Sequence, residues 1–342
     1  MTEIHGSCDP AFESVRGLLQ QQLAQGNEVG ASLCVNIDGQ NVVDLWGGHA
    51  DAEKSKPWEK KHSHWDLLFY KGRPILPGCQ HGTGGITPEE MQDVQKSTAR
   101  LAQQAPWFPA GSQSAYQTST YGHLVGELVR RISGKSLTQF IADEIADPLG
   151  ADFHLGISEE DWPRTADIVP FPAEYAAAFN FDPESFLGKS AAGSALLPLL
   201  PNDPKFRKAE NGSWGGFSNA RALARIGSIV SLDGTVDGKK YLSPETLDAV
   251  MKEQIQGNDP ILFVYMRYAL GFGLPPGKDF RSVPEGDGIC FWGGWGGSLL
   301  VMDRRRRMTI AYMMNKMEFR TIGCARAEEY VQDIYKNFDA KK

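Results

Sequence analysis

One glycine-rich segment near the C-terminal end offers a backbone that another molecule could approach closely. Residues 291–298 read FWGGWGGS and lie between two segments with the composition of β-strands. Glycine weakens a strand, so several glycines in one usually mark a close approach to the backbone. A bulged or tightly packed strand would give the same pattern without any ligand. The segment is therefore a candidate site that needs support from other residues.

Motifs for phosphate binding and for the common serine hydrolases are absent. Lys135 and Lys189 each stand between a glycine and a serine, as at the end of a phosphate loop. That loop also needs a glycine five residues before its second glycine, where this chain has Val129 and Pro183. No Gly-x-Ser-x-Gly elbow occurs, which excludes the usual nucleophile of α/β-hydrolases. We therefore expect no nucleotide site of the phosphate-loop type.

Histidine and cysteine spacing does not favour a metal centre. His62, His64 and His81 lack both the His-Glu-x-x-His spacing and a carboxylate partner at a fixed offset. The cysteines are odd in number and form no Cys-x-x-Cys pair, so we expect reduced, structural thiols. They are Cys8, Cys34, Cys79, Cys290 and Cys324. These residues therefore predict no metal site.

Both ends of the chain carry the elements that would position the glycine-rich segment. Apolar residues recur at helical spacing over residues 10–25, which predicts a helix ending near Gly26. Residues 31–37 and 41–46 are β-rich and are joined by Asp38-Gly39, a strong hairpin signal. Further strands are predicted over 268–273, 288–292, 298–302 and 308–314, followed by a helix over 323–338. Residues 304–307 are four arginines, which we interpret as a solvated hairpin turn.

The middle of the chain is mainly helical. Residues 87–150 contain amphipathic segments at 121–132 and 137–145, and a further helix is predicted over 219–232. Residues 162–205 are rich in proline and predict long loops around short helices. This order of elements predicts one sheet that is built from both ends of the chain, with helices between them.

Composition limits the class of protein. The net charge of −7 gives no broad attraction to nucleic acid or to an anionic membrane. The N-terminus lacks the basic and apolar regions of a signal peptide, and no run of 18 apolar residues occurs. We expect a soluble, cytoplasmic protein that binds neither nucleic acid nor membrane. The sequence gives no indication of its oligomeric state.

Short motifs along nearly the whole chain match those of one enzyme family and follow one another in the same order as in that family. They lie at 43–48, 51–53, 57–59, 115–116, 121–127, 148–153, 219–225, 242–244, 270–272 and 292–294. With these matches the chain resembles the serine β-lactamase-like esterases, which include carboxylesterases related to class C β-lactamases and fungal transesterases. The resemblance implies an α/β (α+β) fold of the β-lactamase/transpeptidase type, with an antiparallel sheet and flanking terminal helices. Residues 1–74 and 206–342 would form that domain, and residues 75–205 an inserted helical domain that is shorter than in the family.

The resemblance also implies roles for individual residues. The family uses a Ser-x-x-Lys motif, whose serine attacks the carbonyl carbon and whose lysine helps to remove the serine proton. Tyr116 matches the family tyrosine that shares this acid–base work, and Trp292, Gly293 and Gly294 match its Trp-Gly-Gly box. The backbone N–H of Trp295 would then supply half of an oxyanion hole. Both Lys and Tyr need pKa values lowered toward neutrality to act as bases.

The nucleophile itself is missing from the matching position. Alignment from residues 57–59 places Lys71 on the family lysine and Leu68 on the family serine, and no Ser-x-x-Lys occurs anywhere in the chain. Pro74 and Pro77 then interrupt the helix that the family continues at this point. The resemblance resumes near residues 81–85.

Three explanations stay open. A reading frame that mis-states an exon boundary around residues 60–85 would remove the serine and the following helix together. The chain could be a catalytically dead protein that binds a small acyl-bearing molecule. It could also use another nucleophile, for which Ser63, Cys79 and Thr83 are the nearby candidates.

The function that the resemblance implies is acyl transfer through an acyl-enzyme, which requires no metal and no organic cofactor. The protein would hydrolyse or transesterify small carboxylic esters, with an ester or acyl donor and an alcohol acceptor as its partners, in secondary metabolism for example. A peptidoglycan carboxypeptidase or a true β-lactamase is disfavoured, because Trp292 replaces the box lysine that usually meets a substrate carboxylate.

Overall fold

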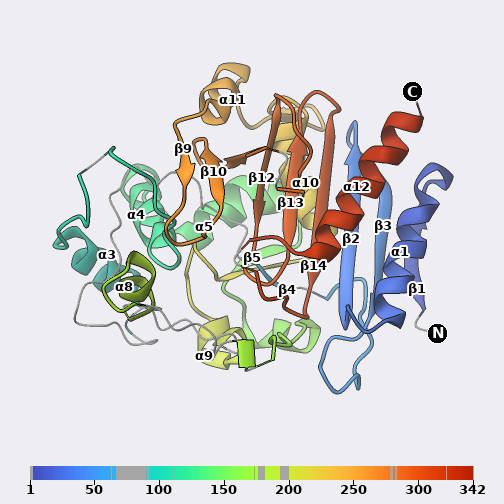
Figure 1. Ribbon diagram of the computed structural model, residues 1–342, viewed down its shortest axis with the longest axis horizontal. Helices are drawn as coiled ribbons and strands as arrows, with labels where there is room; N and C mark the ends of the chain where they lie inside the picture. The colour runs from blue at the N-terminus through green and yellow to red at the C-terminus, as the bar shows by residue number, and fades with distance from the viewer. Residues whose placement is uncertain are drawn as a thin grey trace.

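A nine-stranded antiparallel sheet forms the centre of the computed structural model (Figure 1). The structure describes residues 3–62, 64–66, 90, 92–109, 111–172, 174–175, 182–192, 200–277, 280–281, 283–320 and 322–341. The strands lie in the order β1 (Ile4–Cys8), β3 (Gln40–Gly48), β2 (Gly30–Ile37), β14 (Met308–Met314), β13 (Leu299–Asp303), β12 (Ile289–Gly293), β11 (Gly273–Leu274), β10 (Tyr265–Tyr268) and β9 (Ile255–Asn258). Because β2 pairs with β14, the two ends of the chain meet in the middle of the sheet.

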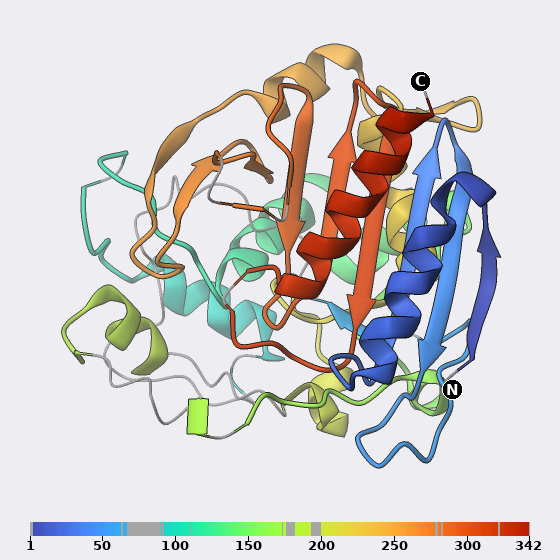
Figure 2. The same cartoon turned by 45° about the vertical axis from the view of Figure 1, so that its right-hand side comes forward.

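Helices cover both faces of this sheet. The terminal helices α1 (Glu13–Ala24) and α12 (Ala325–Ala340) pack side by side on one face (Figure 2). On the other face, α10 (Ala220–Ser231) packs against β2, β13 and β14. Every residue of β13 and β14 is buried, as expected for strands that are covered on both sides. The predicted α/β arrangement, an antiparallel sheet with flanking terminal helices, is confirmed.

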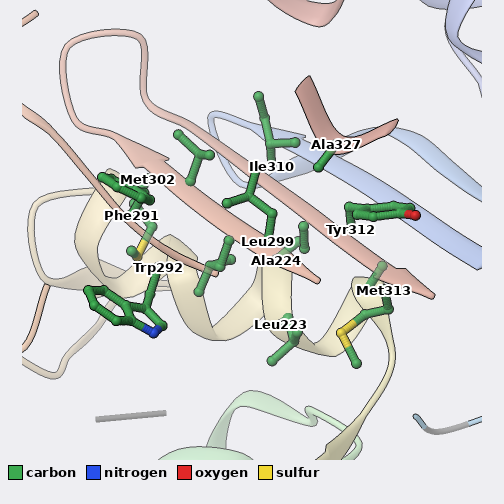
Figure 3. Close-up of a cluster of buried hydrophobic side chains, with 14 of the residues drawn as sticks. Leu223, Ala224, Phe291, Trp292, Leu299, Met302, Ile310, Tyr312, Met313 and Ala327 are labelled. Carbon is green, nitrogen blue, oxygen red and sulfur yellow. The ribbon is translucent and has the colours of Figure 1, made fainter. Parts of the chain in front are cut away.

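The core lies between α10 and the central strands. Figure 3 shows Ala224 of α10 facing the strands, with Ala327 of α12 across the sheet from it. The same cluster contains Trp292, which therefore belongs both to the glycine-rich segment and to the packed interior.

The middle of the chain forms short helices beside the sheet (Figure 1). They are α3 (Val94–Ala102), α4 (Tyr121–Ser133), α5 (Leu137–Ile141), the π-helical turn η2 (Ala142–Ala146), α6 (Asp147–Leu149), η3 (Glu159–Arg164), α8 (Phe186–Ala192), η4 (Leu200–Asn202) and α9 (Pro204–Arg207). A small sheet joins β4 (His64–Asp66), β6 (Gly216–Ser218) and β5 (Phe153–Leu155). The strands β7 (Thr235–Val236) and β8 (Lys239–Lys240) and the helix α11 (Pro244–Met251) follow α10. The limits proposed for the helical domain, residues 75–205, stay a prediction.

Local sequence signals explain several element boundaries. The predicted hairpin is confirmed, since Asp38 and Gly39 between β2 and β3 have φ values of 51° and 84°. Two successive positive φ values are those of a type I′ turn, which Asp-Gly favours. The predicted helices over 10–25, 219–232 and 323–338 are confirmed as α1 with a preceding 3₁₀ turn, α10 and α12. The four arginines form the predicted turn between β13 and β14.

Two strand predictions were wrong or incomplete. Residues 268–273 do not form one strand, because Gly271 has φ of 93° and the N–H of Ala269 donates to the oxygen of Phe272. That turn separates β10 from β11. The edge strand β1 was missed, since its pairing with β3 depends on Gly6. A Cβ at Gly6 would lie 1.9 Å from the backbone oxygen of Asp44.

Candidate active site around Trp292

The indole of Trp292 is the centre of a buried aromatic cluster. Its ring stacks on Tyr116, with ring centroids 5.8 Å apart and planes at 18°, and lies 6.2 Å from the ring of Tyr268. Tyr116 precedes α4, Trp292 is on β12 and Tyr268 ends β10. We call these three residues the aromatic cluster. Of the predicted site residues, the structure thus brings Tyr116 and Trp292 into direct contact.

Asp259 lies beneath the aromatic cluster and joins its members. Its carboxylate is 1% exposed and accepts hydrogen bonds from the hydroxyl of Tyr268 at 2.8 Å and from the backbone N–H of Tyr116. The N–H groups of Ile261 and Leu262 donate to the same carboxylate at 2.9 and 3.0 Å. A buried carboxylate with four donors holds those donors in one arrangement. Asp259 therefore fixes the backbone of Tyr116 and the ring of Tyr268 against Trp292.

Electrostatics in the cluster keep its tyrosines protonated. Burial and the nearby carboxylate of Asp259 raise the pKa of Tyr116 well above its ordinary value of 10. The pKa of Tyr268 is raised for the same two reasons. Burial also raises the pKa of Asp259, although its four hydrogen bonds act in the opposite direction. In the surroundings that the described residues provide, Tyr116 is thus a proton donor. The role of a base, which the family resemblance implies, would need a lowered pKa instead.

The glycine-rich segment is the end of a strand followed by a turn, and not one continuous strand. β12 ends at Gly293, and Gly294 begins the turn by donating its N–H to the oxygen of Ser298 at 2.8 Å. Packing explains part of the glycine content. A Cβ at Gly297, where φ is 140°, would lie 2.7 Å from the sulfur of Cys324. The glycines were predicted to allow a close approach to the backbone. Part of that approach is made by the protein itself, at Cys324 just before α12.

Two N–H donors in this segment have no acceptor within the described part of the chain. The indole Nε1 of Trp292 is buried and unpaired there. The backbone N–H of Trp295, in the turn after Gly294, also donates to none of the described residues. A buried donor without a partner costs about 1–3 kcal/mol. The Trp292 donor is enclosed by the protein, whereas Trp295 is half-buried, so its N–H is the candidate donor to an oxygen atom of a bound molecule.

The ring of Trp295 belongs to a second group of aromatic side chains. It lies edge-on to Phe171 with ring centroids 5.9 Å apart, and Phe171 in turn packs on Phe319 at 5.1 Å. These contacts anchor the turn that carries the Trp295 N–H.

The remaining predicted site residues cannot be placed. Leu68 and Lys71 lie outside the described residues, and so do Ser63, Cys79 and Thr83. The pKa of every described cysteine is raised by burial, to about 11 for Cys8 and Cys324, which disfavours a reactive thiolate at these positions.

The histidines give no sign of a metal site in the part of the chain that the structure describes. Burial lowers the pKa of His62, whose Nδ1 accepts the N–H of Glu59. His81 and the side chain of His64 lie outside the described residues. Among the residues that the structure describes, no group of three potential metal ligands occurs. None of the described helices is long and apolar enough to cross a membrane.

Sequence reasoning missed Asp259 and Tyr268. Asp259 is followed by a proline, a pairing typical of turns, and this was the one local signal at that position. Neither residue belongs to a recognisable motif, because their role comes from contacts with Tyr116 and Trp292, which are distant in sequence.

Comparisons with known proteins agree on one family. The family model described as Beta-lactamase matches residues 79–332, a range that includes Tyr116 and Trp292 but begins after Leu68 and Lys71. The chain is 27% identical over 373 residues to the esterase/beta-lactamase LipL of Mycobacterium tuberculosis (strain ATCC 25618 / H37Rv), covering 92% of this chain and 83% of the relative.

Solved structures show the same likeness. A family VIII carboxylesterase superposes with a TM-score of 0.85 at 28% identity, over 98% of this chain and all of the other. A penicillin-binding protein homologue from Caulobacter crescentus gives a TM-score of 0.81 at 28% identity, with the same coverage. The predicted β-lactamase/transpeptidase-like fold is confirmed. Since the family model spans most of the sequence and includes the contact between Tyr116 and Trp292, this chain belongs to the beta-lactamase family and resembles its carboxylesterases.

Proposed function

We propose that this protein transfers the acyl group of small carboxylic esters at the aromatic cluster and the adjoining turn. The observation that carries the proposal is the backbone N–H of Trp295, two residues beyond β12 and next to the Trp292 box, which donates to no acceptor among the described residues. An N–H in that position suits the oxygen of an ester carbonyl, which becomes negatively charged as the tetrahedral intermediate forms. Esterase names among the similar proteins support the same class of substrate.

The proposed chemistry assigns Tyr116 the role of an acid. A hydroxyl or thiol attacks the carbonyl carbon and gives its proton to the neutral amine of Lys71. The protonated phenol of Tyr116, whose pKa is raised, gives its proton to the leaving alcohol oxygen and regains one from Lys71. Water or a second alcohol then takes the acyl group in the reverse of these steps. Ser63, Cys79 and Thr83 are the proposed sources of the nucleophile, because Leu68 cannot serve.

Hydrolysis of p-nitrophenyl butyrate by the purified protein tests this function. We expect measurable turnover that falls about 100-fold or more in Tyr116→Phe, because general acid–base groups typically contribute that much. Tyr241→Phe is the matched control, since Tyr241 lies after β8 and outside the aromatic cluster. Equal rates in the wild type and in Tyr116→Phe would contradict a catalytic role for the cluster.

A second candidate function is binding without turnover, which Leu68 favours. In that case the aromatic cluster and the adjoining turn bind a small acyl-bearing molecule, and p-nitrophenyl butyrate is not hydrolysed above the buffer rate. Calorimetric titration with a non-hydrolysable butyrate amide then separates a binding protein from an inactive one. Sequencing the transcript across codons 60–85 tests the further possibility that a Ser-x-x-Lys motif has been lost from the reading frame.

A further inference from the structure

A basic cavity of about 950 Å³ lies apart from the aromatic cluster. Its walls come from the β2–β3 hairpin, the segment before β4, the loop after α6 and the first turns of α10. None of the residues of the aromatic cluster lines it. Its charged lining consists of Lys60, Lys61, Arg164, Arg221, Arg225 and Asp152. A volume of this size lies in the range of about 300–1,000 Å³ that is usual for small-molecule sites.

Two arginines of this cavity are one helical turn apart on α10, and each is fixed by hydrogen bonds to other residues of the protein. Arg221 donates from Nε and Nη2 to the carboxylate of Asp44 at 2.6 and 2.7 Å. Arg225 donates from Nε to the oxygen of Leu149 at 3.3 Å and from Nη2 to Asp237. The Nη1 atoms of both arginines donate to no residue that the structure describes. Since residues four apart share a helix face, these two free donors belong to the same side of α10.

Two lysines supply further positive charge. Lys60 and Lys61 are exposed and form no ion pair with any described carboxylate. Lys60 lies 5.9 Å from the ring of Trp46, and the guanidinium of Arg221 lies 5.6 Å from the same ring. An aromatic face attracts cations, so Trp46 interacts favourably with both positive groups. The lysine charges are thus the part of the cavity's charge that no carboxylate in the described ranges balances.

The ion pairs around the cavity determine which charge a ligand would need in order to fit. Arg164 is balanced by Asp152 and Asp161, with N–O distances of 2.8 Å to each. Arg221 and Arg225 each have one carboxylate partner. The cavity therefore keeps a small excess of positive charge together with several unused N–H donors. Guanidinium and ammonium donors in this combination suit an oxyanion.

We propose that this cavity binds a small molecule that carries a phosphate or carboxylate group. The oxyanion contacts the free Nη1 donors of Arg221 and Arg225 and the ammonium groups of Lys60 and Lys61. The rest of the molecule occupies the remaining volume against Leu149, Gly150 and Ala222. The positive end of α10 lies at the same place and adds to the attraction for a negative charge. This site is independent of the ester chemistry proposed for the aromatic cluster.

Calorimetric titrations of the purified protein with inorganic phosphate, pyrophosphate and citrate, at low and constant ionic strength, test the proposal. We expect one saturable site per chain for at least one of these anions. The double variant Lys60→Gln/Lys61→Gln and the single variant Arg225→Gln should each weaken binding by about tenfold or more, the equivalent of one charge-assisted hydrogen bond. Arg225 is chosen because its partner Asp237 is 69% exposed and leaves no buried charge behind.

The matched control is Lys239→Gln/Lys240→Gln, which removes an adjacent pair of exposed lysines on β8. This control should bind the anion as the wild type does. A preference for phosphate over citrate assigns a phosphorylated ligand, and the reverse preference assigns a carboxylate. Non-saturable heats for all three anions, or equal weakening in the control, would overturn the proposal.

Discussion

At the scale of single residues, the carboxylate of Asp259 decides how the candidate active site is arranged. It is the one acceptor shared by Tyr268, the backbone of Tyr116 and the turn at Ile261. Tyr116 and Tyr268 both pack on Trp292, so a change at Asp259 reaches all members of the aromatic cluster. Asp259 is therefore a positioning residue, because it acts on the cluster through other groups.

We predict that Asp259→Asn exposes the backbone N–H of Tyr116 to exchange with solvent. The amide retains one acceptor oxygen but loses the charge that binds four donors, which should cost about 1–3 kcal/mol of folding free energy. Hydrogen exchange of the peptide that contains Tyr116, followed by mass spectrometry, measures the effect directly.

Asp303→Asn is the matched control for this experiment. Asp303 is also fully buried and also accepts from a tyrosine hydroxyl, that of Tyr335 at 3.1 Å. The Asp303→Asn variant should lower the thermal midpoint. Its exchange at Tyr116 should rise only as much as the global loss of stability requires. If exchange at Tyr116 is the same in both variants once the global loss of stability is allowed for, Asp259 does not hold that residue.

At the scale of elements, the start of α12 is fastened to the sheet through a buried ion pair. Arg326 near the N-terminus of α12 lies 3.1 Å from the carboxylate of Glu28, which also accepts the hydroxyl of Tyr312 on β14. Arg326 donates in addition to the oxygen of Lys316 at 2.6 Å. Complete burial raises the pKa of Glu28 to about 7, although Arg326 opposes the shift. The contact between α12 and the sheet therefore contains a carboxyl group, that of Glu28, which titrates near neutral pH.

The pH dependence of stability should report this group. The carboxyl of Glu28 ionises near pH 4.5 in the unfolded chain and near 7 in the folded protein. Its stabilising contribution is thus fully present below pH 4.5 and is lost as the pH rises through 7. We expect Glu28→Gln to gain stability relative to the wild type across that interval, by an amount on the order of 3 kcal/mol.

Thermal midpoints of both proteins between pH 4 and pH 8 check this prediction. Glu127→Gln is the control, because Arg130 and Arg131 lower the pKa of Glu127 to about 2. Its difference from the wild type should stay flat above about pH 5.5, where Glu127 is ionised in both the folded and the unfolded chain. A difference for Glu28→Gln that is constant, or that changes in the opposite direction, would mean that Arg326 keeps Glu28 ionised throughout.

At the scale of the whole molecule, the sequence was sufficient where the signal is local or periodic. Apolar spacing predicted α1, α10 and α12, and Asp38-Gly39 predicted the first hairpin. Family motifs named Tyr116 and Trp292, which the structure brings into contact from distant parts of the chain.

The features that were missed depend on partners far away in sequence. β1 forms because Gly6 lets the chain approach the backbone of Asp44, and no periodicity in residues 4–8 marks it as a strand. Asp259 matters because Tyr116 and Tyr268 surround it in the fold. The turn at Gly271 divides a segment whose composition alone indicates one strand. The position of the nucleophile stays a prediction, because Leu68 and Lys71 lie outside the described residues.

The most direct test of acyl transfer at this site is the intact mass of the purified protein after exposure to a fluorophosphonate. The account predicts one covalent adduct per chain, lost in Lys71→Ala and in Tyr116→Phe and retained in Tyr241→Phe. Peptide mapping of the adduct should identify Ser63, Cys79 or Thr83 as the modified residue. Absence of any adduct in a protein that is demonstrably folded would contradict covalent acyl transfer by this chain.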